Sequence, residues 1–248
     1  MPIKFSDSKK DNEEYNLPMH NVFNGFAGNI DPNEKPSNSL FKRSTHLKAD
    51  GNTYKLPGAI GKFLGILSDT DNSITLTGEM GSGKTRFALQ LANAYASLGK
   101  RVAIFSLEMS PDNYKVIEMK NQYIVSKNQQ LVDWAGEVPN GITDVENATA
   151  DYDVILIDSF GKLTPDPKEF DRLIKTYRNT AWVVLFQKNG KGTIRGGPSV
   201  NFDAWINLDT IKGAHYKENY VIATKNRYGE VGIKYNVYSG GIMNNENK

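Results

Sequence analysis

Eight consecutive residues have the types and spacing needed to hold phosphate groups. The run from Gly78 to Thr85 reads GEMGSGKT and matches the phosphate-binding pattern G-x-x-x-x-G-K-[ST] at each fixed position. An apolar run precedes it and a helical pattern, residues 86–96, follows it, which is the context in which the motif has a mechanism. Backbone N–H groups and a helix N-terminus can then surround the phosphates. A chance glycine turn before a helix is the alternative, and we expect the chain to bind a nucleoside triphosphate.

The side chains of this loop have separate expected roles. Lys84 would reach the β- and γ-phosphates, and the Thr85 hydroxyl would complete the coordination of Mg²⁺. ATP and Mg²⁺ are therefore the expected cofactors. The residues expected to contact the nucleotide are Gly78, Glu79, Met80, Gly81, Ser82, Gly83, Lys84, Thr85 and Arg86.

Three later apolar runs end in polar side chains that suit phosphate chemistry. Ligands of open α/β sheets lie at the carboxyl ends of the strands, so these residues are candidates for the same site. Glu108 could activate the attacking water, although an exposed surface glutamate is the alternative. Asp158 ends a strand in the Walker B pattern and would hold Mg²⁺ directly or through water. Gln187 could hydrogen-bond the γ-phosphate or the water and report hydrolysis to the following loop.

Two cations near the end of the chain could act on a neighbouring subunit. Lys225 and Arg227 are two residues apart on an expected extended segment, so both side chains would point the same way. In a ring or filament they could stabilise charge on the γ-phosphate, as arginine fingers do. A hairpin turn with surface cations is the alternative interpretation.

Composition limits the class of protein. The chain has 248 residues, enough for one α/β domain and an appendage, and no cysteine, which excludes disulfides, cysteine zinc sites and thiol catalysis. Three scattered histidines make a transition-metal site improbable. No window approaches the roughly 18 apolar residues of a membrane span, and the N-terminus lacks a signal-peptide core. We expect no membrane contact and a cytoplasmic location, which would be a host cytoplasm for a phage or mobile-element protein.

Apolar runs alternate with helical patterns over most of the chain, which predicts a mainly parallel twisted sheet with helices on both faces. Residues 1–54 are polar without apolar period and are expected to form a flexible arm, while residues 55–248 form the domain, opened by the apolar segment 56–67. Residues 231–238 could add a closing antiparallel strand. The expected strands are 73–77, 101–106, 152–157, 181–186, 204–208 and 220–224, and the expected helices are 84–98, 111–119, 143–150 and 167–178.

Basic residues gather after the run that ends at Gln187. No acidic residue lies between Asp171 and Asp203, and the glycine-rich loop 188–200 carries Lys188, Lys191 and Arg195. A mobile basic loop beside a phosphate sensor suits contact with a nucleic-acid backbone. An ordinary solvated loop and helix face would give the same composition.

The joint order of these motifs resembles the RecA-like P-loop ATPase core, and in particular the DnaB-type replicative helicases and RadA-type recombination ATPases. Residues 105–110, FSLEMS, look like the helicase segment that carries the catalytic glutamate. Residues 225–229, KNRYG, are similar to the K-N-R-F-G motif of RadA proteins and to the K-x-R finger of the helicases. The resemblance covers roughly residues 56–240 and lacks the zinc module, the protease-like domain and the helical N-terminal domain found in those families. It therefore implies the ATPase core and leaves helicase activity open.

Several functions remain compatible with the sequence. The first is an oligomeric ATP-driven motor or filament on single-stranded DNA in replication or recombination. The alternative is a RecA-type ATPase that acts on protein partners as a loader, regulator or assembly factor, with the arm as a contact for a partner. A P-loop kinase is a third class, against which Glu108 argues because it points to water as the acceptor.

Overall fold

The computed structural model describes residues 40, 42, 44, 47–188 and 203–243. Most of the arm expected at residues 1–54 lies outside this part of the chain. Its last residues do not, because Thr53–Tyr54 form β1, which pairs antiparallel with β2 (Leu67–Ser68). The compact unit runs from Ala49 to Lys248. Residues 49–54 thus belong to the domain rather than to the arm.

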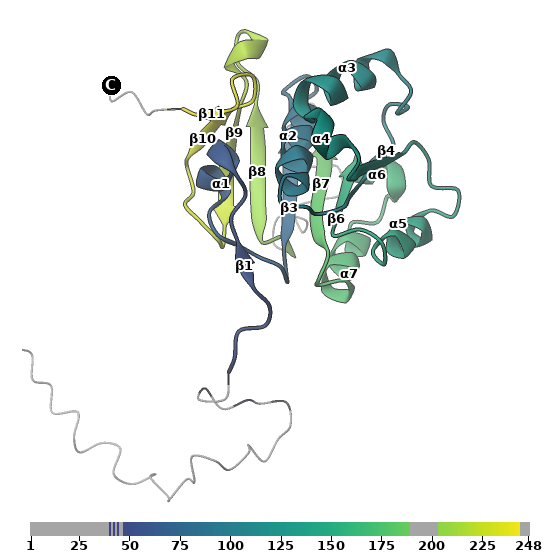
Figure 1. Ribbon diagram of the computed structural model, residues 1–248, viewed down its shortest axis with the longest axis vertical. Coiled ribbons are helices and arrows are strands. Elements are labelled where there is room, and N and C mark those ends of the chain that lie inside the picture. The colour runs from purple at the N-terminus through teal and green to yellow at the C-terminus, as the bar shows by residue number, and fades with distance from the viewer. Residues whose placement is uncertain (1–39, 41, 43, 45–46, 189–202, 244–248) are drawn as a thin grey trace, which may run out of the picture. The chain divides into compact units, whose positions relative to one another are not determined.

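Within the described residues, nine strands form one sheet in the order β11-β10-β9-β8-β3-β7-β6-β4-β5 (Figure 1). The strands from β8 to β5 are parallel, as expected for a mainly parallel sheet. Strand β10 lies in the expected closing antiparallel segment, whereas β9 and β11 are also antiparallel, which the sequence did not indicate. Their bounds are β3 Ser73–Gly78, β4 Val102–Ser106, β5 Val132–Ala135, β6 Val154–Asp158, β7 Ala181–Gln187, β8 Ile206–Ile211, β9 Tyr220–Asn226, β10 Lys234–Asn236 and β11 Gly241–Ile242.

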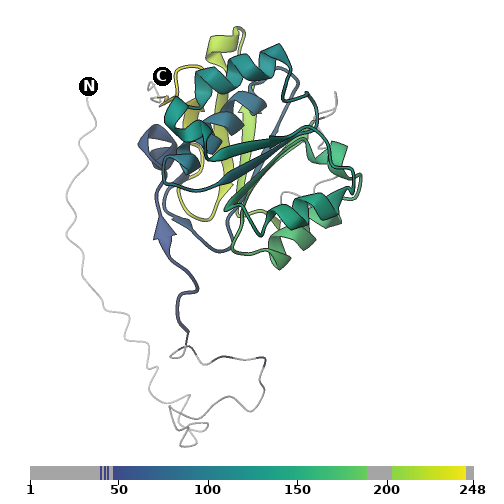
Figure 2. The ribbon, with the colours of Figure 1, turned by 45° about the vertical axis from the view of Figure 1, so that its right-hand side comes forward.

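Helices cover both faces of the sheet (Figure 2). On one face lie α1 to α4, and on the other lie α5 to α7. In the described ranges, no helix combines the length and the apolar character that crossing a membrane requires. The bounds are α1 Gly58–Leu64, α2 Lys84–Ala96, α3 Tyr114–Tyr123, α4 Ser126–Gln129, α5 Ile142–Ala148, α6 Phe160–Leu163, α7 Lys168–Thr176 and the 3₁₀-helix η2 Tyr216–Glu218.

Alternation along the central strands builds two separate cores. In β6, Leu156 faces the layer of α1 and α2, whereas Ile155 and Ile157 face the layer of α5 to α7. Strands buried on both faces read as continuous apolar runs, which is why the sequence located them well. The apolar segment 56–67 packs on the first core, with Phe63, Leu64 and Leu67 fully buried, as expected.

The differences from expectation have local causes. Helix α3 begins at Tyr114 rather than at Pro111, because the Asn113 side chain caps it by accepting a hydrogen bond from the Lys115 N–H at 2.9 Å. Strand β5 was not expected. Its sequence, VDWA, is short, lies at the sheet edge and buries only Val132 fully, so it has little apolar period to detect.

Candidate phosphate-binding site

The GEMGSGKT segment forms a turn between the end of β3 and the start of α2. Gly83 precedes the helix in the left-handed conformation, with φ of 99°, which side chains disfavour. The Lys84 Nζ donates to the carbonyl oxygens of Gly78 at 3.0 Å and Glu79 at 2.9 Å. The buried Ser82 hydroxyl donates to the Glu79 carbonyl at 2.8 Å. These bonds shape a loop whose backbone N–H groups and lysine can cradle an anion.

The side chains of Thr85 and Asp158 place two oxygen atoms where a hard cation could bind. The Thr85 hydroxyl donates to Asp158 Oδ2 at 2.6 Å, which joins the first turn of α2 to the end of β6. Burial raises the pKa of Asp158 to about 6, against the opposing effect of the Thr85 hydrogen bond. The described residues contain no cluster of three or more metal-ligating side chains. The oxygen pair therefore fits Mg²⁺ that is shared with nucleotide phosphates, because that ion commonly takes one or two protein oxygens.

Glu108 and Gln187 meet at the same end of the sheet. The Gln187 Nε2 donates a hydrogen bond to Glu108 Oε1, although the residues belong to the ends of β7 and β4. The N–H groups of Leu107 and Glu108 donate to the Asp158 carbonyl at 2.7 and 3.1 Å. The backbone of Glu108 is thus held beside Asp158, and its exposed carboxylate is oriented by the Gln187 amide.

The charges of these groups influence one another. Burial lowers the pKa of Lys84, while the carboxylates of Asp158 and Glu108 raise it and partly compensate. The ammonium is short of direct counter-charge, because its two hydrogen-bond partners are neutral backbone carbonyls. A polyphosphate would supply that charge.

A pocket opens beside the loop and adds residues that the sequence did not indicate. The Asn219 Nδ2 donates to the Gly81 carbonyl at 3.0 Å and ties the β8–β9 connection to the loop. The Arg86 guanidinium lies 5.7 Å from the centroid of the half-exposed Tyr216 ring. Neither Asn219 nor Tyr216 carries a sequence signal, since both lie in a polar connection far from the motif. The pocket is lined by Met80, Gly81, Gly83, Lys84, Thr85, Arg86, Glu108, Met109, Lys115, Met119, Gln187, Tyr216 and Asn219.

Lys225 and Arg227 lie at the opposite end of the sheet. Asn226 pairs with Ile206 across β8 and β9, and Ile206 pairs with Ile74 at the start of β3. Gly78 is four residues further along, about 13 Å at the rise of an extended strand. This register keeps Arg227 away from the P-loop of its own chain.

The expected nucleic-acid contacts are only partly described. Lys188 follows β7, and its Nζ lies 3.0 Å from Asp209 Oδ2 in an ion pair. The charge of Lys188 is therefore partly neutralised within the chain. Lys191 and Arg195 lie outside the described residues.

The fold and this site define a class. A mainly parallel sheet between two helical layers, a P-loop after β3 and an acidic residue at the end of β6 give the chain the RecA-like P-loop fold. A family model described as an AAA domain matches residues 70–169, which include the P-loop, Glu108 and Asp158. No curated protein matches the sequence.

Solved structures share the fold at low identity. A KaiC-like protein PH0186 from Pyrococcus horikoshii OT3 is 17% identical, with a TM-score of 0.60 over 78% of this chain and 99% of that one. A second solved structure, an ATPase domain, is 17% identical, with a TM-score of 0.54 over 71% of this chain and 85% of that one. The flagellar accessory protein FlaH from Methanocaldococcus jannaschii is 14% identical, with a TM-score of 0.58 over 71% of this chain and 90% of that one.

Proposed function

We propose that the chain binds ATP with Mg²⁺ and hydrolyses it, and that it works as an oligomer on single-stranded DNA. The observation that carries the nucleotide chemistry is the convergence of Lys84, Thr85, Asp158, Glu108 and Gln187 at one end of the sheet. Hydrogen bonds join Thr85 to Asp158, Asp158 to Glu108 and Glu108 to Gln187, although these residues come from the start of α2 and the ends of three strands. Lys84 precedes Thr85 and bonds to the carbonyl oxygens of the loop.

Each residue of this group has a role in the proposed reaction. Lys84 binds the β- and γ-phosphates, and the Thr85 and Asp158 oxygens hold Mg²⁺. Glu108 orients the attacking water and accepts its proton. Gln187 contacts Glu108 in the structure, so a γ-phosphate that attracts the Gln187 amide would also release the carboxylate to act as the base.

The position of Arg227 supports the proposed oligomer. Its guanidinium lies at the amino end of the parallel strands, far from the P-loop of its own chain. If it stabilises the transition state, it does so on a neighbouring subunit, in a ring or filament of the same chain. An arginine finger is worth about 10³ to 10⁵ in rate.

The proposed DNA contact rests on the basic loop that begins at Lys188. This loop directly follows Gln187, so movement of the sensor would reach it. If Lys188, Lys191 and Arg195 track a phosphate backbone, replacing all three with glutamine should weaken binding equally for all sequences. The salt slope should flatten by about 0.7 for each phosphate that is no longer neutralised. Because Lys188 pairs with Asp209, Lys188→Gln should flatten it less than Arg195→Gln does.

ATPase assays with and without single-stranded DNA, run beside sizing measurements, test the proposal. We expect turnover to rise with protein concentration as subunits associate and to rise again with DNA. Concentration-independent turnover by a strict monomer would contradict the oligomer. Absence of DNA binding at low salt would instead favour an ATPase that acts on a protein partner, for which the polar N-terminal arm is the candidate contact.

A further inference from the structure

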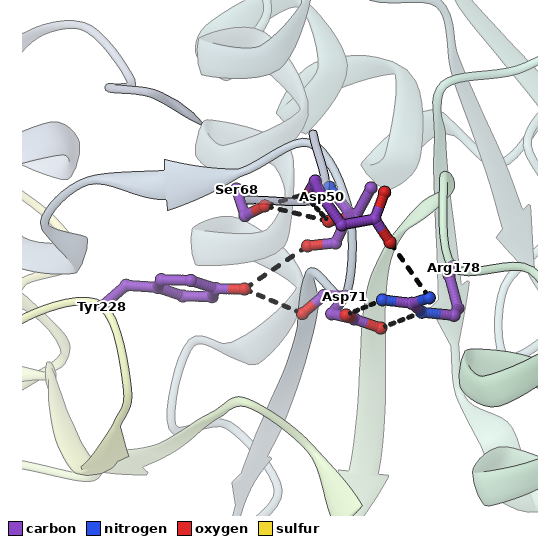
Figure 3. A network of polar contacts seen from close by, with 6 residues as sticks. Asp50, Ser68, Asp71, Arg178 and Tyr228 are labelled. Atoms are coloured by element: carbon purple, nitrogen blue, oxygen red, sulfur yellow. Dashed lines mark hydrogen bonds and ion pairs between the residues drawn. The ribbon is translucent and has the colours of Figure 1, made fainter. Parts of the chain in front are cut away.

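Two arginines at the amino end of the parallel strands have opposite surroundings. Arg178, just after α7, is held by two carboxylates, with its Nε 2.7 Å from Asp71 Oδ1 and its Nη1 3.2 Å from Asp50 Oδ2 (Figure 3). Arg227 has its Cζ 4.7 Å from the centroid of the Trp205 ring. Among the described residues, no acidic group forms an ion pair with Arg227. Stacking uses the face of a guanidinium and leaves its in-plane N–H donors available for phosphate.

The ring under Arg227 is itself supported. Trp205 stacks on Tyr228 with the ring centroids 5.4 Å apart and the planes 16° from parallel. The Trp205 backbone N–H donates to the Ser73 hydroxyl at 3.1 Å, and the Arg227 backbone N–H donates to the Trp205 carbonyl at 3.2 Å. Arg227 is therefore bound to the Trp205 backbone and stacked on its ring.

Tyr228 connects this stack to the Arg178 network. Its hydroxyl donates to the Asp71 carbonyl at 3.0 Å, while the Asp71 carboxylate accepts from Arg178 (Figure 3). A continuous series of contacts thus runs from Arg178 through Asp71, Tyr228 and Trp205 to Arg227. Arg178, which is paired with carboxylates, holds Asp71 in place, and Asp71 in turn anchors Tyr228. Arg227, which lies on Trp205, remains available to bind phosphate.

The backbone on either side of Tyr228 is equally constrained. The Asn226 side chain donates to the Leu64 carbonyl at 3.1 Å and accepts from the Tyr228 N–H at 2.9 Å. Gly65 has φ of 87°, and a Cβ there would lie 2.2 Å from the Tyr228 carbonyl oxygen. The segment KNRYG is therefore held against the end of α1, which limits the positions that Arg227 can take.

We propose that Trp205 and Tyr228 are positioning residues for Arg227, which they hold oriented for the phosphate site of a second copy of this chain. This rests on the proposed action of Arg227 across a subunit boundary. The gain is preorganisation, since a long side chain that is already oriented loses less freedom when it binds. A carboxylate at this place would occupy the same N–H donors that the phosphate needs.

The test replaces the aromatic face while it keeps Arg227. Trp205→Leu should lower kcat about tenfold, the scale of a removed cation–π interaction, with the KM for ATP unchanged. Trp205→Phe should recover most of the rate because it restores a ring. Tyr152→Leu is the matched control, because the Arg101 Cζ lies 4.8 Å from the centroid of the Tyr152 ring in a similar cation–π pair away from Arg227. This variant should leave kcat unchanged.

Subunit mixing separates positioning from a general loss of structure. Trp205→Leu subunits mixed with Lys84→Ala subunits should regain activity, because an intact P-loop then meets a correctly held finger. Trp205→Leu subunits mixed with Arg227→Ala subunits should not regain activity, because neither subunit then supplies a correctly held finger. Equal recovery in both mixtures, or a Trp205→Leu protein with full kcat, would overturn the proposal.

A milder variant covers the case in which Trp205→Leu fails to fold. Tyr228→Phe keeps the stacked ring and removes only the hydroxyl anchored on Asp71, so kcat should fall several-fold while the KM for ATP stays constant. An unchanged kcat in this variant would contradict the anchoring role. If Arg227→Ala itself keeps full activity, the proposed finger fails, whereas an inactive Arg227→Ala beside fully active Trp205 and Tyr228 variants removes only the positioning role.

Discussion

Charged side chains have different partners at the two ends of the parallel sheet. At the carboxyl end, charged and polar groups from different elements bind one another, as Thr85 binds Asp158 and Gln187 binds Glu108. At the amino end, Arg178 is saturated by carboxylates, whereas Arg227 lies over the Trp205 ring and forms no ion pair with any residue that the structure describes. One end holds a set of groups that a nucleotide would rearrange, and the other presents Arg227 against an aromatic ring.

This difference indicates what each end needs from outside the chain. The carboxyl end contains the phosphate loop, the oxygen pair and the candidate base, so it needs ATP and Mg²⁺. At the amino end, Arg227 has no phosphate site of its own chain in reach, so its proposed action as a finger would require another subunit. Variants at the two ends should therefore fail in different ways.

The largest effect is expected at the carboxyl end. Lys84→Ala removes the ammonium that contacts the phosphates and little core packing, so tight ATP·Mg²⁺ binding or turnover should be lost while the fold is retained. Calorimetry with ATP, turnover assays and a thermal melt measure these properties. A folded Lys84→Ala protein with unchanged affinity and turnover would contradict the P-loop assignment.

Arg227→Ala should lower turnover by about 10³-fold or more, the scale of a finger supplied in trans, while ATP binding remains. Mixtures of the two variants test whether Arg227 acts on a neighbouring subunit. Arg227→Ala and Lys84→Ala subunits should together recover part of the activity. Titration of one variant into the other at fixed total concentration measures this. Failure to recover, with both variants folded and associated, would place Arg227 outside catalysis.

Glu108→Gln should slow hydrolysis by about 10²-fold or more and preserve ATP affinity, because the amide keeps the shape but cannot take the proton. Single-turnover hydrolysis measured beside nucleotide affinity separates the two. Turnover close to that of the unchanged protein would make Glu108 a surface residue.

Tyr216→Ala tests the pocket residues that the sequence did not indicate. If the base of the nucleotide stacks on this half-exposed ring, its removal should raise the KM for ATP about tenfold with little change in kcat. Tyr216→Phe should behave as the unchanged protein, since the ring is kept. A KM that is equal in all three proteins would place the base elsewhere.

The smallest effects come from two matched asparagines. Asn219 bridges Gly213 and Gly81 at the P-loop, and Asn226 bridges Leu64 and Tyr228 beside the finger. Each alanine variant should cost roughly 2 kcal/mol of unfolding free energy, about 1 for each hydrogen bond removed. Urea unfolding measures this cost, and steady-state kinetics should show a raised KM for Asn219→Ala and a lowered kcat for Asn226→Ala. Identical kinetic changes in the two variants would remove the distinction between the ends.

Much of the carboxyl end could be predicted from the sequence. The P-loop is a local motif, and the strands before Asp158 and Gln187 are apolar runs buried on both faces. Because parallel strands place their carboxyl ends together, an order of motifs along the chain is enough to bring Glu108, Asp158 and Gln187 to one site. The fold class follows from the same alternation of strands and helices.

Only the tertiary structure decided the surroundings of the remaining residues. The antiparallel register of β9 carries Arg227 away from its own P-loop, and contacts across more than a hundred residues, such as Arg178 with Asp71 and Asn219 with Gly81, leave no local pattern. The pairing of Lys188 with Asp209 is equally invisible in sequence. Local propensity and period determine the elements, whereas single polar contacts depend on how distant elements meet. For this reason the sequence indicates which residues carry charge, and the structure decides which of them remain available.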